Sequence, residues 1–186
     1  MEEVKTKDGG ISMTTKLYWR SIKNEIDAVT YKIAALRADE NRPDLKAEMQ
    51  TGVDVMEENY CYRKVDEAVL YLQSISGVIE NVGRVEDEER DELNDRLHKT
   101  VTCWDISVDM ERVKETDEQL TAMFHRFVVL KVLCDWLGMT VGDAVKVYQD
   151  EYTELKSEVE LMSLGTPRKR KREPRKETND IEIQYE

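Results

Sequence analysis

Apolar residues in the first part of the chain recur at alternating steps of three and four, the spacing of a helix with one apolar stripe. We predict a first helix that begins at a cap, Thr14 or Thr15, and ends at Asn41-Arg42-Pro43. Pro43 then opens a second helix that runs to Val82 and stops at Gly83. Two helices joined by so short a turn form an antiparallel hairpin. The stripe of the first helix consists of Trp19, Ile22, Ile26, Val29, Ile33 and Leu36.

Three more helices are predicted in the second half. The third opens at the acidic run 86–89 and extends to Val113, with a local break foreseen at the β-favouring residues 100–104. Thr116 and Gln119 form a capping box for the fourth helix. Residues 120–137 are the most apolar stretch and are apolar on more than one face, which indicates a central helix that Gly138 ends. Thr140 caps a fifth helix that runs to about Met162.

Composition agrees with a helix-rich protein, because only 8 Gly and 3 Pro are available for turns in 186 residues. The predicted fold class is all-α, a helical hairpin plus a helical bundle of about five helices. We divide the chain into a flexible leader at 1–12, an all-α helical domain at 13–164 and a disordered tail with a basic cluster at 165–186.

The apolar stripe of the first helix has two interpretations. Its steps cover fewer heptads than independent coiled coils usually show, so packing within the chain is favoured. A homo-oligomer built on the same stripe is the alternative. Either way, helical faces are the surfaces predicted to meet a protein partner.

The tail differs in charge from the rest of the chain. Residues 1–165 carry 21 Lys and Arg against 35 Asp and Glu, a balance of −14. Segregation of this kind predicts an arm that contacts nucleic acid without sequence preference, or an import receptor that reads the short pattern at 169–172. Seven cations within nine residues would make the contact: Arg168, Lys169, Arg170, Lys171, Arg172, Arg175 and Lys176.

Two further features flank the basic cluster. Thr166, followed by Pro167, Arg168 and Lys169, fits a proline-directed phosphorylation pattern, and a phosphate there would pair with the neighbouring arginines. The last residues, 180–186, alternate acidic and apolar side chains in the sequence D-I-E-I-Q-Y-E. That alternation fits a strand that adds to a sheet edge, or a ragged terminus.

Enzymatic patterns are weak. His98 and Cys103 are five residues apart without an orienting group, and the histidines and cysteines lack the spacing of a zinc site. No phosphate-binding glycine motif occurs. We therefore predict no catalytic residue, no metal and no cofactor. The best enzymatic candidates are carboxylate pairs three residues apart that suit Mg²⁺: Glu86/Glu89, Glu88/Asp91, Glu92/Asp95 and Glu151/Glu154.

Three other features are given structural interpretations. Leu137–Thr140 resembles the turn of a helix-turn-helix, but the following helix is acidic and poorly suited to a DNA groove. Asp135, within the apolar fourth helix, is expected to pair with Lys131 four residues earlier. The three cysteines, Cys61, Cys103 and Cys134, are expected to be free thiols in a reducing compartment.

These observations predict a non-enzymatic helical interaction or assembly protein whose basic arm contacts nucleic acid or an import receptor. One alternative is a virus-type scaffolding or virion accessory protein, and a second is an all-α, Mg²⁺-dependent nucleotide hydrolase. No apolar run suits a signal peptide or a membrane span. The expected location is intracellular: the nucleus in a eukaryotic setting, otherwise the cytoplasm or a virion.

Overall fold

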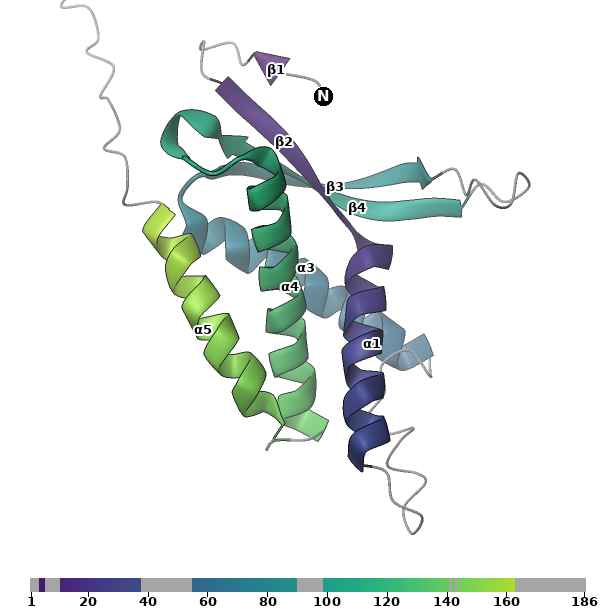
Figure 1. Cartoon of the computed structure of the whole chain (residues 1–186). Helices are drawn as coiled ribbons and strands as arrows, with labels where there is room; N and C mark the ends of the chain where they lie inside the picture. Colours follow the sequence, from purple (N-terminus) through teal and green to yellow (C-terminus); the bar gives the residue numbers. More distant parts are fainter. Residues whose placement is uncertain are drawn as a thin grey trace, which may run out of the picture.

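The computed structural model describes residues 4–5, 11–37, 55–89, 99–140, 142 and 144–162. This part of the chain combines four α-helices with an antiparallel sheet (Figure 1). The fold is therefore mixed α/β, and the all-α prediction is wrong. In chain order the elements are β1 (Val4–Lys5), β2 (Ile11–Tyr18), α1 (Trp19–Arg37), α3 (Val55–Ser76), β3 (Ile79–Glu89), β4 (Lys99–Asp109), the 3-10 helix η1 (Met110–Arg112), α4 (Asp117–Thr140) and α5 (Val145–Met162).

The strands form one sheet in the order β1-β2-β4-β3, with every neighbouring pair antiparallel. The helices gather on one side of this sheet (Figure 1). Leu17, Trp104 and Ile106 belong to the buried core shared with the helices, and the Trp104 indole donates a 2.7 Å hydrogen bond to Asp66 of α3. Pairing of β2 with β4 ends at Tyr18 and Cys103, so the outer half of β3 and β4 continues as a two-stranded ribbon.

Strands β3 and β4 replace most of the predicted third helix. Trp104 and Val108 are four residues apart and fit a helix, but Ile106 between them is equally buried. This two-residue period places all three side chains on the helix-covered face of a strand. The β-favouring run at 100–104 was therefore the start of an element and not a break within a helix. A bulge between Ile79 and Asn81 interrupts the pairing of β3 with β4.

The first predicted helix is shorter than expected because its start is a strand. Thr14 and Thr15 lie in β2 and do not cap a helix, and α1 begins at Trp19. The stripe of α1 packs within the chain as favoured: Ile22 and Ile26 are fully buried, and Trp19, Val29 and Ile33 pack against the same core. Leu36 lies outside this packing and is 86% exposed.

The second predicted helix ends earlier than expected. Helix α3 stops at Ser76, and Gly77 follows with φ of 59°, a conformation that favours glycine over residues with a side chain. Ser76 Oγ accepts a hydrogen bond from the Ile79 amide at 3.3 Å as the chain enters β3. Gly83, the predicted stop, lies inside β3. The predicted turn and the beginning of this helix fall on residues 38–54, outside the described part.

Helix α4 is central, as predicted. Its capping box is formed: Gln119 Oε1 accepts from the Thr116 amide at 2.9 Å, and Thr116 Oγ1 accepts from the Gln119 amide at 3.4 Å. Helix α4 packs against β2, α1, α3 and α5. Its fully or nearly fully buried residues are Leu120, Phe124, Phe127, Val128, Val129, Leu130, Val132, Leu133, Trp136 and Leu137.

The connection from α4 to α5 differs from the prediction. Gly138 does not end α4, and Thr140 does not cap α5, because Thr140 is the last residue of α4 and its hydroxyl donates to the Trp136 carbonyl at 2.9 Å. Helix α5 ends at Met162 as predicted and runs antiparallel beside α4 (Figure 1). It packs on the core through Tyr148, Tyr152, Leu155, Val159 and Met162.

Two smaller features complete the fold. Residues 4–5 and 11–12 of the proposed leader belong to β1 and β2. No helix in the described part combines the length and apolar character that a bilayer span requires.

Replacement of Phe127 by Ala should lower the free energy of unfolding by about 2–5 kcal/mol, because the side chain is fully buried between the rings of Tyr71 and Tyr152. The control Glu154→Ala, at an exposed position of α5, should change it by less than about 0.5 kcal/mol. Urea denaturation followed by circular dichroism measures both. Equal effects would contradict the central position of α4.

Candidate functional site

The residues predicted to bind nucleic acid lie outside the described part of the chain, and so does the possible phosphorylation site Thr166. They are Arg168, Lys169, Arg170, Lys171, Arg172, Arg175 and Lys176. The structure places their attachment point: α5 is the last described element, and five residues separate its end at Met162 from Arg168.

Of the four carboxylate pairs, Glu151/Glu154 lies on a described helix, α5. Residues 86–89 belong to the strand β3 and not to a helix. Asp91, Glu92 and Asp95 fall outside the described residues. Glu151 contacts Arg126. Among the described residues, no group of three or more His, Cys, Asp or Glu is arranged to hold a metal ion.

The cysteines of the described part are free thiols with little nucleophilic character. Burial raises the pKa of Cys61 to about 12 and that of Cys134 to about 11. Both thiols are therefore protonated near neutral pH, whereas the thiolate is the reactive form. Cys103 is fully buried in β4, and His98, its candidate partner, lies outside the described residues.

The other two structural interpretations have different outcomes. The expected pair of Lys131 and Asp135 is formed at 2.8 Å, and Lys64 of α3 lies 3.7 Å from the second oxygen of the same carboxylate. Residues 137–140 are the last turn of α4 and not the turn between two helices. Asp135 therefore links α4 to Lys64 of α3 by an ion pair. The helix-turn-helix interpretation lacks its turn, because residues 137–140 are helical.

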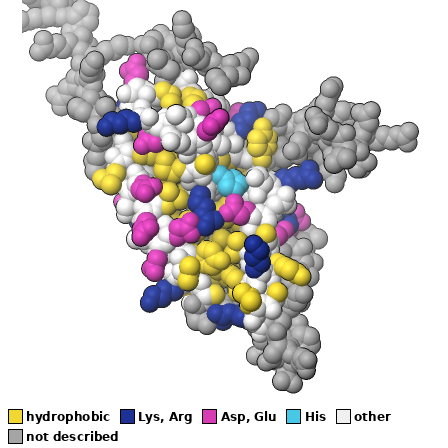
Figure 2. All heavy atoms as spheres, viewed as in Figure 1, with side chains coloured by type: hydrophobic (Ala, Val, Ile, Leu, Met, Phe, Trp, Pro, Cys, Tyr) yellow, Lys and Arg dark blue, Asp and Glu magenta, His cyan; other side chains and the backbone are white. Residues whose placement is uncertain are grey.

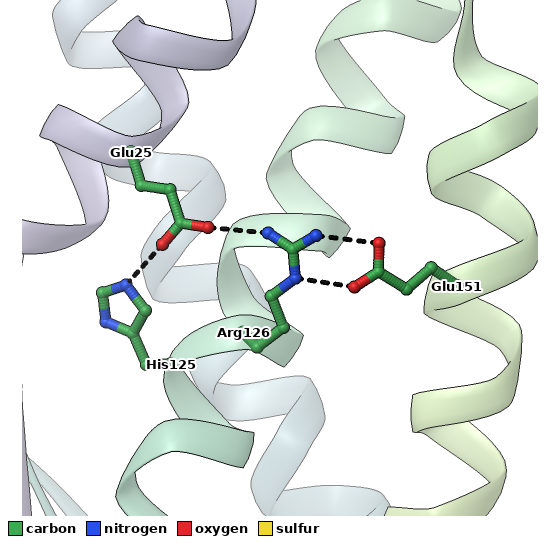
Figure 3. A network of polar contacts seen from close by, with 4 residues as sticks. All are labelled: Glu25, His125, Arg126 and Glu151. Atoms are coloured by element: carbon green, nitrogen blue, oxygen red, sulfur yellow. Dashed lines mark hydrogen bonds and ion pairs between the residues drawn. The ribbon is translucent and has the colours of Figure 1, made fainter.

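A network of four charged or polar side chains joins three helices on one face (Figure 3). Arg126 of α4 donates through Nη1 to Glu25 of α1 at 2.6 Å, and through Nε and Nη2 to Glu151 of α5 at 2.7 and 2.8 Å. His125 Nε2 lies 3.0 Å from the other oxygen of Glu25. Figure 2 shows acidic and basic side chains around the histidine drawn in cyan, next to an apolar area.

Arg126 holds Glu25 and Glu151 at the same time, and we call these contacts the clamp. The two hydrogen bonds to Glu151 are parallel and bidentate, the arrangement for which a guanidinium is suited. The hydrogen bond to Glu151 is the main cause of the raised pKa of Arg126, and the bond to Glu25 adds to it. Because Arg126 is thus engaged by two carboxylates, we assign the network to holding α1 and α5 against α4.

Sequence reasoning missed this network. Arg126 and Glu25 are 101 residues apart, so no local spacing relates them. The available signal was a pair of polar residues, His125 and Arg126, within the most apolar segment of the chain. Such residues need partners when a helix is covered on most sides, but the pattern does not say which carboxylates supply them.

A groove of about 640 Å³ lies beside the network. One wall is β2, the other is the first turns of α4, and α1 closes one end. Thr15 and Thr121 join the two walls through a hydrogen bond between their hydroxyls. The groove is lined by Lys16, Leu17, Tyr18, Ser21, Glu25, Asp117, Glu118, Thr121, Ala122, His125 and Arg126.

Comparisons of the chain with protein-family models, with curated proteins and with solved structures find no match.

Replacement of Arg126 by Met should keep the apolar stem but remove the clamp. We expect a loss of about 1–2 kcal/mol of unfolding free energy, reduced at high salt, because charge-assisted hydrogen bonds are lost at side chains that remain about one-third exposed. The control Lys146→Met, at an exposed position of α5, should cost less than about 0.5 kcal/mol. Urea denaturation at low and high salt measures both, and equal losses would contradict the clamp.

The raised thiol pKa values of Cys61 and Cys134 predict slow alkylation of the folded protein. At pH 8 an ordinary cysteine with a pKa of about 8.5 is partly thiolate, so iodoacetamide should modify these thiols more than about a hundredfold more slowly than after unfolding in urea. The native rate of Cys134 should continue to rise up to about pH 11. Mass spectrometry of modified peptides measures this, and equal rates at pH 8 would contradict the thiol environments described.

Proposed function

We propose that this protein is a non-enzymatic interaction protein whose basic segment, residues 168–176, binds nucleic acid without reading its sequence. One observation carries the proposal: the segment has seven cations and one acid in nine residues, while residues 1–165 have a balance of −14. Clustered cations neutralise phosphates and release their counterions, which gives affinity that is independent of sequence. In this role the protein works in the nucleus, the cytoplasm or a virion.

Ion pairs within the described part support the assignment of nucleic-acid binding to the basic segment. Arg126 is bound by Glu25 and Glu151, and Lys131 by Asp135. Lysines 23 and 156 face carboxylates one turn away on their own helices. These cations are paired within the body, so the segment after α5 is the part of the chain best supplied with cations for a phosphate backbone.

The acidic body should weaken this affinity and make it depend strongly on salt. Phosphates approaching the segment also meet the negative field of the body, although counterions screen that repulsion beyond about 10 Å at 0.1 M salt. A sequence-independent contact that is weak at moderate salt suits reversible assembly on nucleic acid, and the helical faces remain available to a protein partner.

The test is fluorescence anisotropy of labelled duplex DNA with the full chain across a salt series. If about five of the seven cations engage, the slope of log K against log salt should lie near −4 to −5. Unrelated DNA sequences should bind equally well. Replacement of all seven cations by Ala should abolish binding.

A matched control separates charge from side-chain geometry. Conversion of the four arginines of the segment to lysine keeps its charge, so we expect binding and salt slope to be retained. Absence of binding by the full chain at low salt would contradict the proposal and leave the import pattern at 169–172 to explain the segment. Undiminished binding by the alanine variant would place the nucleic-acid contact on the body.

A further inference from the structure

The exposed side of α5 carries a row of carboxylates. Asp150, Glu154 and Glu158 recur at steps of four residues, so they lie along one side of the helix. All three are exposed, whereas the residues that pack on the core, such as Tyr152 and Val159, lie on another side. Figure 2 shows acidic side chains along the side of the molecule that α5 forms. We call the three carboxylates the acidic stripe.

The body supplies no counter-charge to the acidic stripe. Within the described part of the chain, none of its three carboxylates forms an ion pair. Glu151 and Glu160 of the same helix are, by contrast, bound by Arg126 and Lys156. Like charges one helical turn apart destabilise a helix, so a cationic partner along the stripe would be favourable.

We propose that residues 168–172 of this chain fold back along α5 and bind the acidic stripe. Their sequence, R-K-R-K-R, places Arg168, Arg170 and Arg172 at every second position. In an extended segment such side chains point the same way and recur about every 6.6 Å. Carboxylates four residues apart on a helix recur about every 6 Å. The three arginines therefore match the three carboxylates when the segment runs antiparallel to α5, with Arg168 nearest Glu158.

The chemistry of the two partners is complementary. A guanidinium and a carboxylate form a planar, bidentate pair, and Arg126 already makes such a pair with Glu151 of α5 at 2.7 and 2.8 Å. The carboxyl end of a helix also favours nearby cations. Glu173, the one acid of the basic segment, would follow at the level of Lys146, an exposed cation one turn before Asp150.

The connection between α5 and the segment permits this reversal. Residues 163–167 have the sequence S-L-G-T-P, in which Gly165 and Pro167 are of the types that end helices and favour turns. Such a connection extends to at most about 20 Å. Glu158 lies only about 6 Å before Met162 along the helix axis, so Arg168 can reach it.

A hollow beside the last turn of α5 offers the connection an apolar contact. Its volume is about 390 Å³, and Met123, Leu161 and Met162 are among the residues that line it. Leu164 is the apolar residue of the connection, and its burial in this hollow would begin the reversal. Glu158, the last carboxylate of the stripe, lines the same hollow, so the chain would pass directly from the hollow to the stripe.

Docking would occupy the arginines that the proposed function assigns to phosphates. Exposed ion pairs are individually weak, and here the tether supplies a high effective concentration. The docked form would therefore yield to a polyanion of higher charge density, which makes the stripe a built-in competitor of nucleic acid. This regulatory consequence rests on the proposed function, whereas the docking itself does not.

Paramagnetic relaxation in the full chain without nucleic acid tests the docking. A nitroxide label is attached to Ser157→Cys, at an exposed position beside the stripe. The native thiols are buried or weakly reactive, so the introduced cysteine is labelled selectively. At low salt the label should raise the amide relaxation rates of residues 168–172 at least about threefold more than at about 0.5 M salt, where ion pairs are screened.

Two matched charge variants locate the contact. E154Q/E158Q removes two carboxylates of the stripe and should lower the low-salt relaxation to the high-salt value. The control, E58Q/E67Q, removes the same charge from exposed positions of α3 and should keep the wild-type relaxation. Equal relaxation in wild type and E154Q/E158Q would overturn the proposal. Equal loss in both variants would also overturn it, because the contact would then depend on the net charge of the body.

Two further measurements separate the remaining explanations. Relaxation in a mixture of spin-labelled chains and separate isotope-labelled chains would show that a second copy supplies the stripe, and would overturn docking within one chain. A label at Ala28→Cys, on α1 at the other side of α4, should have a much smaller effect, and an equal effect would overturn the assignment to α5. Failure of DNA binding with the relaxation retained would contradict the proposed function and leave the docking supported.

Discussion

Burial of α4 on nearly all sides is the constraint on which the rest of the fold depends. The sheet, α1, α3 and α5 each cover part of this helix, and each fully buried large apolar side chain contributes about 1.5–3 kcal/mol. The cover leaves polar residues of α4 at the seams between its neighbours. Arg126 occupies the seam between α1 and α5, and Asp135 occupies the seam toward α3. Charged side chains thus connect α4 to its neighbouring helices where apolar packing ends.

The sequence predicted the helices better than the strands, for a physical reason. Helix α4 has a capping box and the most apolar segment of the chain, and both signals are local. Trp104 and Val108 are separated by four residues, a spacing that satisfies both a helix and a strand, and only the burial of Ile106 distinguishes them. In β2, Thr15 and Leu17 are buried with the two-residue spacing of a strand. The apolar stripe of α1 starts at Trp19, directly after this strand. Strand spacing and helix spacing therefore adjoin, and the sequence pattern does not mark the boundary between them.

The candidate sites also differ in whether a local pattern in the sequence marks them. The basic segment is visible in the sequence because charge density is local. The Glu25–Arg126–Glu151 clamp and the groove beside β2 join residues about 100 positions apart, and depend on a sheet that the helical pattern did not predict. Contacts between residues far apart in the sequence could therefore not be derived from the spacing of residues along the chain.

The antiparallel arrangement of α4 and α5 determines how the body would bear a pull on the basic segment. A pull on Met162 along the axis of α5 would act parallel to the interface of α5 with α4. Contacts loaded in this direction slide against one another and resist together, whereas contacts pulled apart sideways break one at a time. Tyr152, Val159 and the bidentate bond of Glu151 would share the load. In the proposed nucleic-acid role, such sharing of the load would help the domain to keep its fold while the segment is attached to a polymer.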